Sequence, residues 1–215
     1  MAKNFSEIAF TDSVKARQEQ YRSRQQYARM DRLARGATLT LAETEFIAAR
    51  DSFYLATVGE TGYPYVQFRG GPHGFLRVLD AQTLGYADFR GNRQYITLGN
   101  LDQNDRAALI LMDYANRSRL KIYARIEVIN AKDRPELMEK LSVPGYDAKI
   151  ERAMLLHVEA FDWNCPQHIT PRFTMEELQA MNAPLYEHIA KLEAELMRFK
   201  AHMKESKPSY QSLSG

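Results

Sequence analysis

The feature that most constrains the fold is a series of six β-type segments that follow one another closely along the chain. Most neighbouring segments are joined by turns of hairpin composition, such as Gly-Glu-Thr-Gly at residues 59–62, where glycine supplies the positive φ that a tight turn needs. The segments are residues 52–58, 63–69, 75–79, 83–88, 106–112 and 119–130. Such a series predicts a small antiparallel β-barrel or sandwich, and with the helical segments described below the expected class is mainly β with helices (α+β).

Two of these segments separate polar from apolar side chains with a period of two, as a strand with two different faces does. In the earlier segment one face carries Tyr63, Tyr65, Gln67 and Arg69, and the other carries Pro64, Val66 and Phe68. In the later segment one face carries Arg119, Lys121, Tyr123 and Arg125, and the other carries Leu120, Ile122, Ala124, Ile126 and Val128. Pro64 is compatible with a strand near its start or at a sheet edge.

Polar residues from three of the strands are candidates for a common binding surface. Gln67 and Arg69 lie on one strand, Asp88 ends a second, and Arg119 and Lys121 belong to a third. Alternating charge is also typical of a solvated strand face. The mixture of amide and cationic side chains with tyrosine favours a recessed binding surface, and the sequence predicts that these residues converge.

The stretch GYADFRGNRQYITLGNL, residues 85–101, connects one of these strands to a helix. A strand at 84–88 and a turn at 89–91 are followed by Asn92, which is a favourable N-cap and predicts that the helix begins there. Arg93 in the first turn opposes the helix dipole, and Arg90 lies just upstream. Both arginines make sense if an anion such as phosphate binds the helix N-terminus; the alternative is two solvated arginines beside an ordinary loop.

Composition excludes several classes of function. The chain has 215 residues, 45% of them hydrophobic, and a net charge of +2, which is too small for general binding to nucleic acid or membranes. Neither an N-terminal signal nor an apolar run of membrane-spanning length is visible, and the single Cys165 fits a reducing compartment, so we expect a cytoplasmic protein. The five histidines lack metal-ligand spacing, and no metal site is expected.

Helical segments flank the β-rich region on both sides. Residues 11–35 predict a polar, basic helix, and residues 40–50 a second helix with Leu41, Phe46 and Ile47 on its buried side. A helix is also expected at 134–141, with Pro135 near its start, followed by a last strand at 154–161.

The C-terminal region predicts another helix. Thr174 and Glu177 form a capping box, and Pro184 is expected to interrupt the helix that follows. Beyond it, apolar residues alternate in steps of four and three, at Leu185, Ile189, Leu192, Leu196, Phe199 and Met203. This short heptad seam suits packing on the protein's own barrel and a two-subunit coiled coil equally.

Several of these segments together resemble the pyridoxamine 5′-phosphate oxidase-like, FMN-binding split barrels. The matching stretches are FYLATVGETGYPYVQFRGG, GYADFRGNRQYITLGNL and RLKIYARIEV. The resemblance implies a split-barrel domain at residues 51–172, after a helical arm at 1–50 and before a helical extension at 173–206. Residues 207–215 are expected to be a disordered tail.

The resemblance also implies which residues hold FMN. Tyr65, Gln67, Arg69 and the Gly70 backbone would lie along the flavin from the ring to the ribityl chain. The backbone of Ala87, Asp88 and Phe89 would add contacts. The phosphate would be held by Asn92, Arg93 and Gln94, with Arg119 or Lys121 approaching from a neighbouring strand. Gln94 stands where the relatives closest to the true oxidase carry lysine, which removes one charge from the expected phosphate shell.

Split-barrel relatives also imply a homodimer and a residue over the flavin from the region after the last strand. Trp163, Gln167 and His168 are candidates for that role, whereas Cys165 lacks the spacing of a catalytic Cys–His pair. The segment DWNCPQHITPRF contains Arg172 as its only strong cation. The true oxidases carry several basic residues there for the substrate phosphate, so pyridoxamine phosphate is not the expected substrate.

These features predict an FMN-dependent oxidoreductase acting on an unidentified small molecule or electron donor, with no obvious catalytic acid or base. A haem-binding or deazaflavin-using split barrel is the alternative within the fold. A non-catalytic flavin-binding or interaction protein that uses the helical tail is the alternative in another class.

Overall fold

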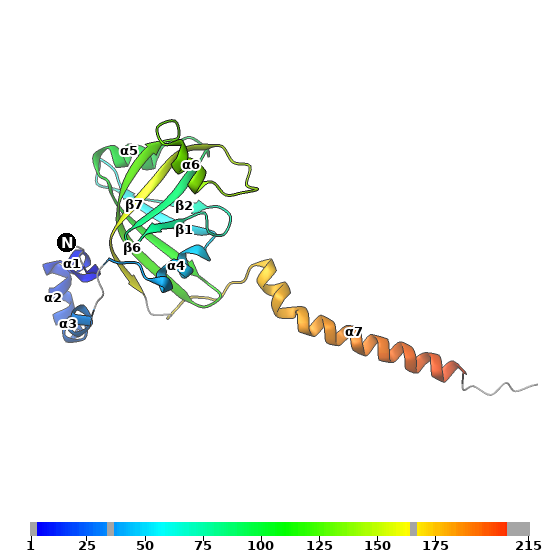
Figure 1. Ribbon diagram of the computed structural model, residues 1–215. Coiled ribbons are helices and arrows are strands. Elements are labelled where there is room, and N and C mark those ends of the chain that lie inside the picture. The colour runs from blue at the N-terminus through cyan, green and yellow to red at the C-terminus, as the bar shows by residue number, and fades with distance from the viewer. Residues whose placement is uncertain (1–3, 34–36, 164–166, 206–215) are drawn as a thin grey trace, which may run out of the picture. The chain divides into compact units, whose positions relative to one another are not determined.

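The structure is a computed structural model that describes residues 4–33, 37–163 and 167–205 (Figure 1). Cys165, residues 207–215 and the end of the predicted helix at 34–35 lie outside the described residues. The chain divides into two compact units, residues 1–170 and 171–215, which we describe separately. Among the described residues, no helix has both the length and the apolar character that crossing a membrane requires.

The first unit contains one antiparallel sheet of seven strands, as the sequence predicts. In sheet order they are β2, β1, β5, β6, β7, β4 and β3, so the short hairpin β1–β2 and the pair β3–β4 form its two ends. The strands are β1 (Ser52–Val58), β2 (Pro64–Gly70), β3 (Arg77–Asp80), β4 (Thr83–Phe89), β5 (Arg106–Asp113), β6 (Ser118–Asn130) and β7 (Ile150–Trp163). Pro64 begins an edge strand, the position at which proline costs no ladder hydrogen bond.

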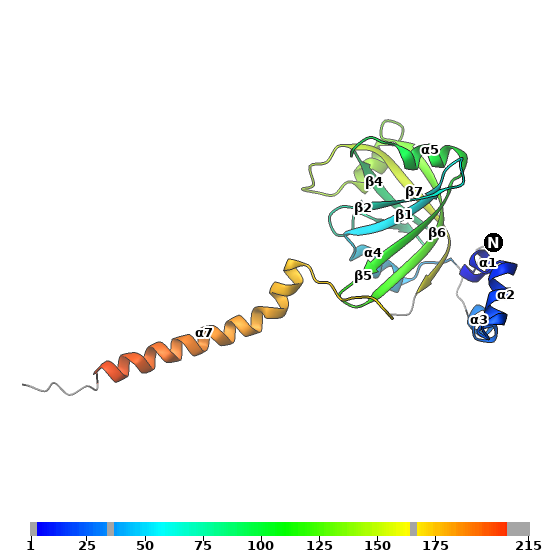
Figure 2. The ribbon, with the colours of Figure 1, turned by 180° about the vertical axis from the view of Figure 1, so that it is seen from behind.

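The sheet curls until its two ends approach each other, which gives the split barrel of Figures 1 and 2. An ion pair between Arg69 of β2 and Asp88 of β4 joins strands that are five places apart in the sheet order. Inside, Phe53, Phe75 and Tyr86 form a buried aromatic cluster with ring centroids 5.4–6.3 Å apart. The third strand, β3, begins two residues later than predicted, because Phe75 enters the core from the preceding loop rather than from the strand.

The helices of the first unit only partly follow the prediction. They are α1 (Phe5–Ala9), α2 (Asp12–Gln20), α3 (Arg24–Leu33), α4 (Leu41–Ala48), α5 (Ile96–Gln103) and α6 (Pro135–Leu141). The single helix expected at 11–35 is wrong, because Arg22 has φ +60° and breaks it into α2 and α3. The predicted second helix is confirmed as α4, but its buried side differs from the prediction. Leu41 is 72% exposed, and Glu43 is buried together with Ile47.

The long strand β6 changes its buried face along its length. Leu120 to Ile126 alternate into the barrel core as predicted, but Val128 is exposed and Ile129 is buried. Ile129 belongs to a second apolar cluster with Leu137 and Leu141 of α6. Val128 thus stays on the predicted apolar face but is exposed at this end of the strand, where α6 covers the opposite face of the sheet.

The second unit contains the helix α7 (Met175–Glu205). Its capping box is confirmed: the Thr174 backbone N–H donates to Glu177, and the Glu177 backbone N–H donates to the Thr174 hydroxyl. The predicted interruption at Pro184 is wrong. The helix continues through the proline and bends in its first turns (Figure 1), as helices with an internal proline do.

Candidate functional site

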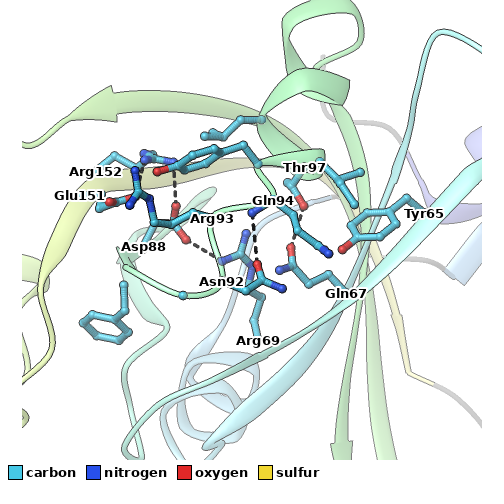
Figure 3. A pocket seen from close by; sticks show the side chains of 15 residues that line it. Tyr65, Gln67, Arg69, Asp88, Asn92, Arg93, Gln94, Thr97, Glu151 and Arg152 are labelled. Atoms are coloured by element: carbon cyan, nitrogen blue, oxygen red, sulfur yellow. Dashed lines mark hydrogen bonds and ion pairs between the residues drawn. The ribbon is translucent and has the colours of Figure 1, made fainter.

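The principal polar cavity, which we call the rim pocket, lies where β2 approaches β4 and β7, beneath the loop that leads into α5 (Figure 3). Its volume is about 290 Å³. Its lining residues are Tyr65, Gln67, Arg69, Asp88, Phe89, Gly91, Asn92, Arg93, Gln94, Tyr95, Ile96, Thr97, Leu98, Glu151 and Arg152. Three arginines thus face two carboxylates, which gives the pocket an excess of positive charge.

The alternation of β2 brings its polar side chains to the pocket. Tyr65, Gln67 and Arg69 are partly buried, whereas Val66 and Phe68 on the other face are about 60% exposed. Gln67 lies opposite Leu55 of β1, a core residue, so the polar face of β2 is the inward one. At this edge of the barrel, polar groups and the cavity replace the apolar core.

A network of ion pairs forms the floor of the rim pocket. Asp88, which is 6% exposed, accepts from Arg69 Nη1 at 2.5 Å and from Arg152 Nη1 at 3.3 Å. Arg152 also donates to Glu151 at 2.6 Å, and Arg90 Nε donates to Glu151 at 2.7 Å. The Arg90 hydrogen bond and the Arg152 charge hold the pKa of Glu151 below its ordinary value. The predicted approach of Gln67, Arg69 and Asp88 is confirmed.

Two polar atoms under the pocket are buried without a hydrogen-bond partner among the described residues. They are Arg69 Nε and the Tyr86 hydroxyl, and the Arg69 guanidinium lies 5.8 Å from the Tyr86 ring centroid. Burial raises the pKa of Tyr86, which keeps its phenol neutral. Most buried donors in native proteins are paired, so an unpaired guanidinium N–H at a pocket wall is suited to a ligand acceptor.

The loop between β4 and α5 differs from the prediction. The helix begins at Ile96 rather than at Asn92, because Arg93 and Tyr95 have φ of +62° and +54°, which an α-helix does not accommodate. Asn92 instead accepts from the Gln94 backbone N–H at 3.2 Å, the local turn that asparagine forms as readily as an N-cap. Arg93 therefore lies on a loop.

Interactions of this loop and helix orient individual pocket side chains. Thr97 donates to Gln67 Oε1 at 2.7 Å, which leaves the Gln67 amide N–H₂ available to a ligand. The Arg93 guanidinium hydrogen-bonds to Tyr95, an interaction that raises the pKa of Arg93 above its ordinary value. Asn100 donates to Thr57 at 3.0 Å and fixes α5 against β1.

Arg119 and Lys121, expected at the phosphate, do not lie at the rim pocket of their own chain. Across the sheet, Phe68 pairs with Tyr54, Tyr54 with Ile110, and Ile110 with Lys121, so all four share the outer face. Gln67 belongs to the inner face. The prediction that Arg119 and Lys121 meet the polar side chains of β2 within one chain is therefore wrong. Alternation alone does not tell which face of each strand points into the barrel.

Three further predicted residues lie outside the lining of the pocket. Trp163 donates its Nε1–H to Glu43 of α4 at 2.7 Å and packs edge-on against Phe46. Burial alone would raise the pKa of Glu43, but hydrogen bonds from Thr40 and Trp163 outweigh it and lower the pKa. Gly70 and Ala87 adjoin lining residues without lining the cavity.

The main site residue that the sequence prediction missed is Arg152. The last strand begins at Ile150, four residues before the predicted start, and Arg152 is in phase with the buried Met154 and Leu156. Extending the alternation of buried residues towards the start of the strand would have placed Arg152 on the face of β7 that points into the core.

A second cavity, the outer groove, lies on the outer face of β2, β1, β5 and β6 and also measures about 290 Å³. It is mostly apolar, and its lining residues are Phe5, Tyr54, Ala56, Val66, Ala108, Leu109, Ile110, Lys121, Ile122 and Tyr123. Phe5 of α1 stacks on Tyr123 with a centroid distance of 4.9 Å, and Lys121 is 3.7 Å from Asp162. No group of three or more metal-ligating side chains occurs among the described residues.

Comparison with known proteins identifies one family. A family model described as pyridoxamine 5′-phosphate oxidase matches residues 39–159, which is 121 of the 215 residues. No curated protein matches the sequence.

Similarity to solved structures is distant. HupZ of Group A Streptococcus has 14% identity and a TM-score of 0.45, over 63% of this chain and 99% of that chain. An FMN-binding protein of Syntrophomonas wolfei has 12% identity and a TM-score of 0.44, over 56% and 81%. A Clostridium acetobutylicum protein related to general stress protein 26 has 19% identity and a TM-score of 0.43, over 64% and 94%. At such values these similarities carry no conclusion about this chain.

Proposed function

Because the chain belongs to the pyridoxamine 5′-phosphate oxidase family, we propose that it binds FMN in the rim pocket and uses it to transfer electrons to or from a small molecule. The observation that carries the proposal is the donor set of the pocket. Three arginines, the Gln67 amide and an unpaired buried N–H of Arg69 surround one cavity at the barrel rim. The phosphate and the oxygen-rich ribityl chain of FMN would supply hydrogen-bond acceptors for these donors.

The residues divide by their chemistry. Asn92, Arg93 and Gln94 lie on an exposed loop, where an arginine and backbone N–H groups suit a phosphate dianion. Gln67 and Arg69 are held deeper by Thr97 and Asp88 and suit the ribityl chain and the polar edge of the ring. Tyr65 offers an aromatic wall beside them.

When bound, the flavin supplies the redox chemistry, and the protein supplies position and electrostatics. The Arg69–Asp88–Arg152 network keeps the pocket floor rigid and cationic, which favours an anionic ligand. The pocket offers Tyr65 and Tyr95 hydroxyls but no histidine among the residues that line it. Proton exchange with the substrate is then expected to involve water or the substrate itself.

The test of FMN placement compares two ligands that differ only in the phosphate. Arg93→Ala should weaken FMN binding by about tenfold or more, since a hydrogen bond to a charged group contributes about 1.5–3 kcal/mol. Riboflavin affinity should change little. Isothermal titration or flavin fluorescence quenching gives both dissociation constants. Arg106→Ala, an exposed arginine on β5, serves as the control. Equal losses for both ligands, or a wild-type protein that binds neither, would contradict the placement.

A second copy of the chain is part of the proposal. A cavity of about 290 Å³ is just below the range for ligand sites, about 300–1,000 Å³, and one chain leaves it open. The apolar outer groove, with exposed Val66 in its lining and exposed Phe68 on the same sheet face, supplies a surface for association. Arg119 and Lys121 lie on that same outer face, so any contact of theirs with FMN is a contact with the partner's site.

Phe68→Asp tests this homodimer because Phe68 points away from the rim pocket of its own chain. We expect the substitution to weaken FMN binding at least tenfold by separating the barrels, whereas Leu41→Asp, at an exposed apolar residue of α4, should not. Light scattering of the wild type should give about twice the chain mass of 24.8 kDa. Unchanged FMN affinity in Phe68→Asp, or a wild-type monomer that binds FMN tightly, would refute a shared site.

A further inference from the structure

The helix α7 carries an apolar seam along its whole length. Steps of three and four alternate without a break from Met175 to Met203, which is four heptads. Position a is occupied by Met175, Asn182, Ile189, Leu196 and Met203, and position d by Leu178, Leu185, Leu192 and Phe199. Leu192 and Leu196, in the middle of the seam, are 50% and 51% exposed. A 31-residue helix with an exposed a/d seam is typical of a coiled-coil strand.

We infer that α7 pairs with α7 of a second copy as a parallel, in-register, two-stranded coiled coil. The a/d residues favour two strands, since Ile189 occupies an a position and leucine occupies three of the four d positions. Asn182 is the single polar residue of the seam, and one asparagine at an a position selects the alignment in which it meets its own copy.

The residues that flank the seam favour the same arrangement. In a parallel coil, position g of one helix faces position e of the next heptad in the partner. His188 then faces Glu193 of the second helix, and Glu195 faces Lys200. Each pair places a histidine or a lysine opposite a glutamate, and neither pair brings two like charges together.

Pro184 is compatible with this arrangement. It occupies position c, away from the seam, and the helix continues through it. The missing N–H of the proline weakens the helix on the solvent side and bends it. The stronger part of the seam is therefore expected between Leu185 and Met203, on the C-terminal side of the proline.

Cysteine cross-linking in the full-length chain tests the orientation directly, because a disulfide requires Cα atoms within about 7 Å. In a Cys165→Ser background, Leu192→Cys at position d should form an intermolecular disulfide under mild oxidation. Ala194→Cys, at the outward position f two residues away, should cross-link at least tenfold more slowly. Non-reducing electrophoresis gives both rates. If Cys165→Ser fails to fold, the same variants are compared in the wild-type background, where Cys165 alone gives the blank.

Three results would overturn the inference. Equal rates at positions 192 and 194 would mean that contact is random. No disulfide at position 192 would mean that the seam packs on its own chain or on another protein. Cross-linking only in a mixture of Leu185→Cys and Leu196→Cys chains, which combines a d position with an a position, would mean an antiparallel pair. The readout does not depend on FMN or on contact between the barrels, so it stands apart from the proposed function.

Discussion

Asp88→Ala should lower the free energy of unfolding by about 3–5 kcal/mol, the usual cost of removing one partner from a buried ion pair. Asp88 is the carboxylate that accepts from both Arg69 and Arg152, and all three side chains are less than one-fifth exposed. Without Asp88, the guanidinium groups of Arg69 on β2 and Arg152 on β7 lose the carboxylate that both of them contact. Urea unfolding followed by far-UV circular dichroism measures the loss.

A matched variant separates this effect from a general loss of acidic charge. Asp102→Ala removes an exposed carboxylate from α5 and should change stability by less than about 0.5 kcal/mol. The double variant Asp88→Ala/Arg69→Met should recover part of the loss, because an apolar replacement removes the unpaired charge. A cost for Asp88→Ala no larger than that of Asp102→Ala would show that the network does not close the barrel.

The strands could be predicted because each carries its own signal. Alternation in β2 and β6 and glycine-rich turns depend only on local sequence, and all seven strands follow. The start of α5 could not be predicted from local sequence in the same way. Asn92 stabilises a turn and caps a helix with the same side-chain oxygen, and the positive φ of Arg93 and Tyr95 depends on how the loop closes over the pocket.

The residues of the candidate site divide in the same way, into those that local sequence places and those that tertiary structure places. Gln67, Arg69 and Asp88 were predicted together because each stands on the polar or terminal part of a strand. Placing Lys121 correctly requires the register through β1 and β5, which is a tertiary property. Trp163 is the last residue of β7, and its partner Glu43 is 120 residues earlier, in a helix whose buried side differs from the prediction. Long-range polar pairs of this kind leave no periodic trace in a sequence.

The arginines of the rim pocket lead to the expectation that the FMN-loaded protein does not oxidise pyridoxamine 5′-phosphate. That substrate brings a second phosphate, which needs its own clamp, and arginine is best suited to bind it through two hydrogen bonds. Arg69 and Arg152 already donate to Asp88, and Arg90 donates to Glu151. In the proposed function, Arg93 holds the FMN phosphate. The lining residues therefore hold no arginine in reserve for a second dianion.

Turnover is measured in air as pyridoxal phosphate and hydrogen peroxide formed together from pyridoxamine 5′-phosphate, oxygen and water, with release of ammonia. We expect less than about one-hundredth of an ordinary enzyme rate of ~1 s⁻¹. The control is bleaching of the bound flavin by dithionite and its recovery in air, which shows that the same sample is loaded and competent for electron transfer. Formation of both products at ~1 s⁻¹ or faster would mean that a second phosphate site exists, and that Arg69, Arg152 or Arg93 exchanges its present partner for the substrate.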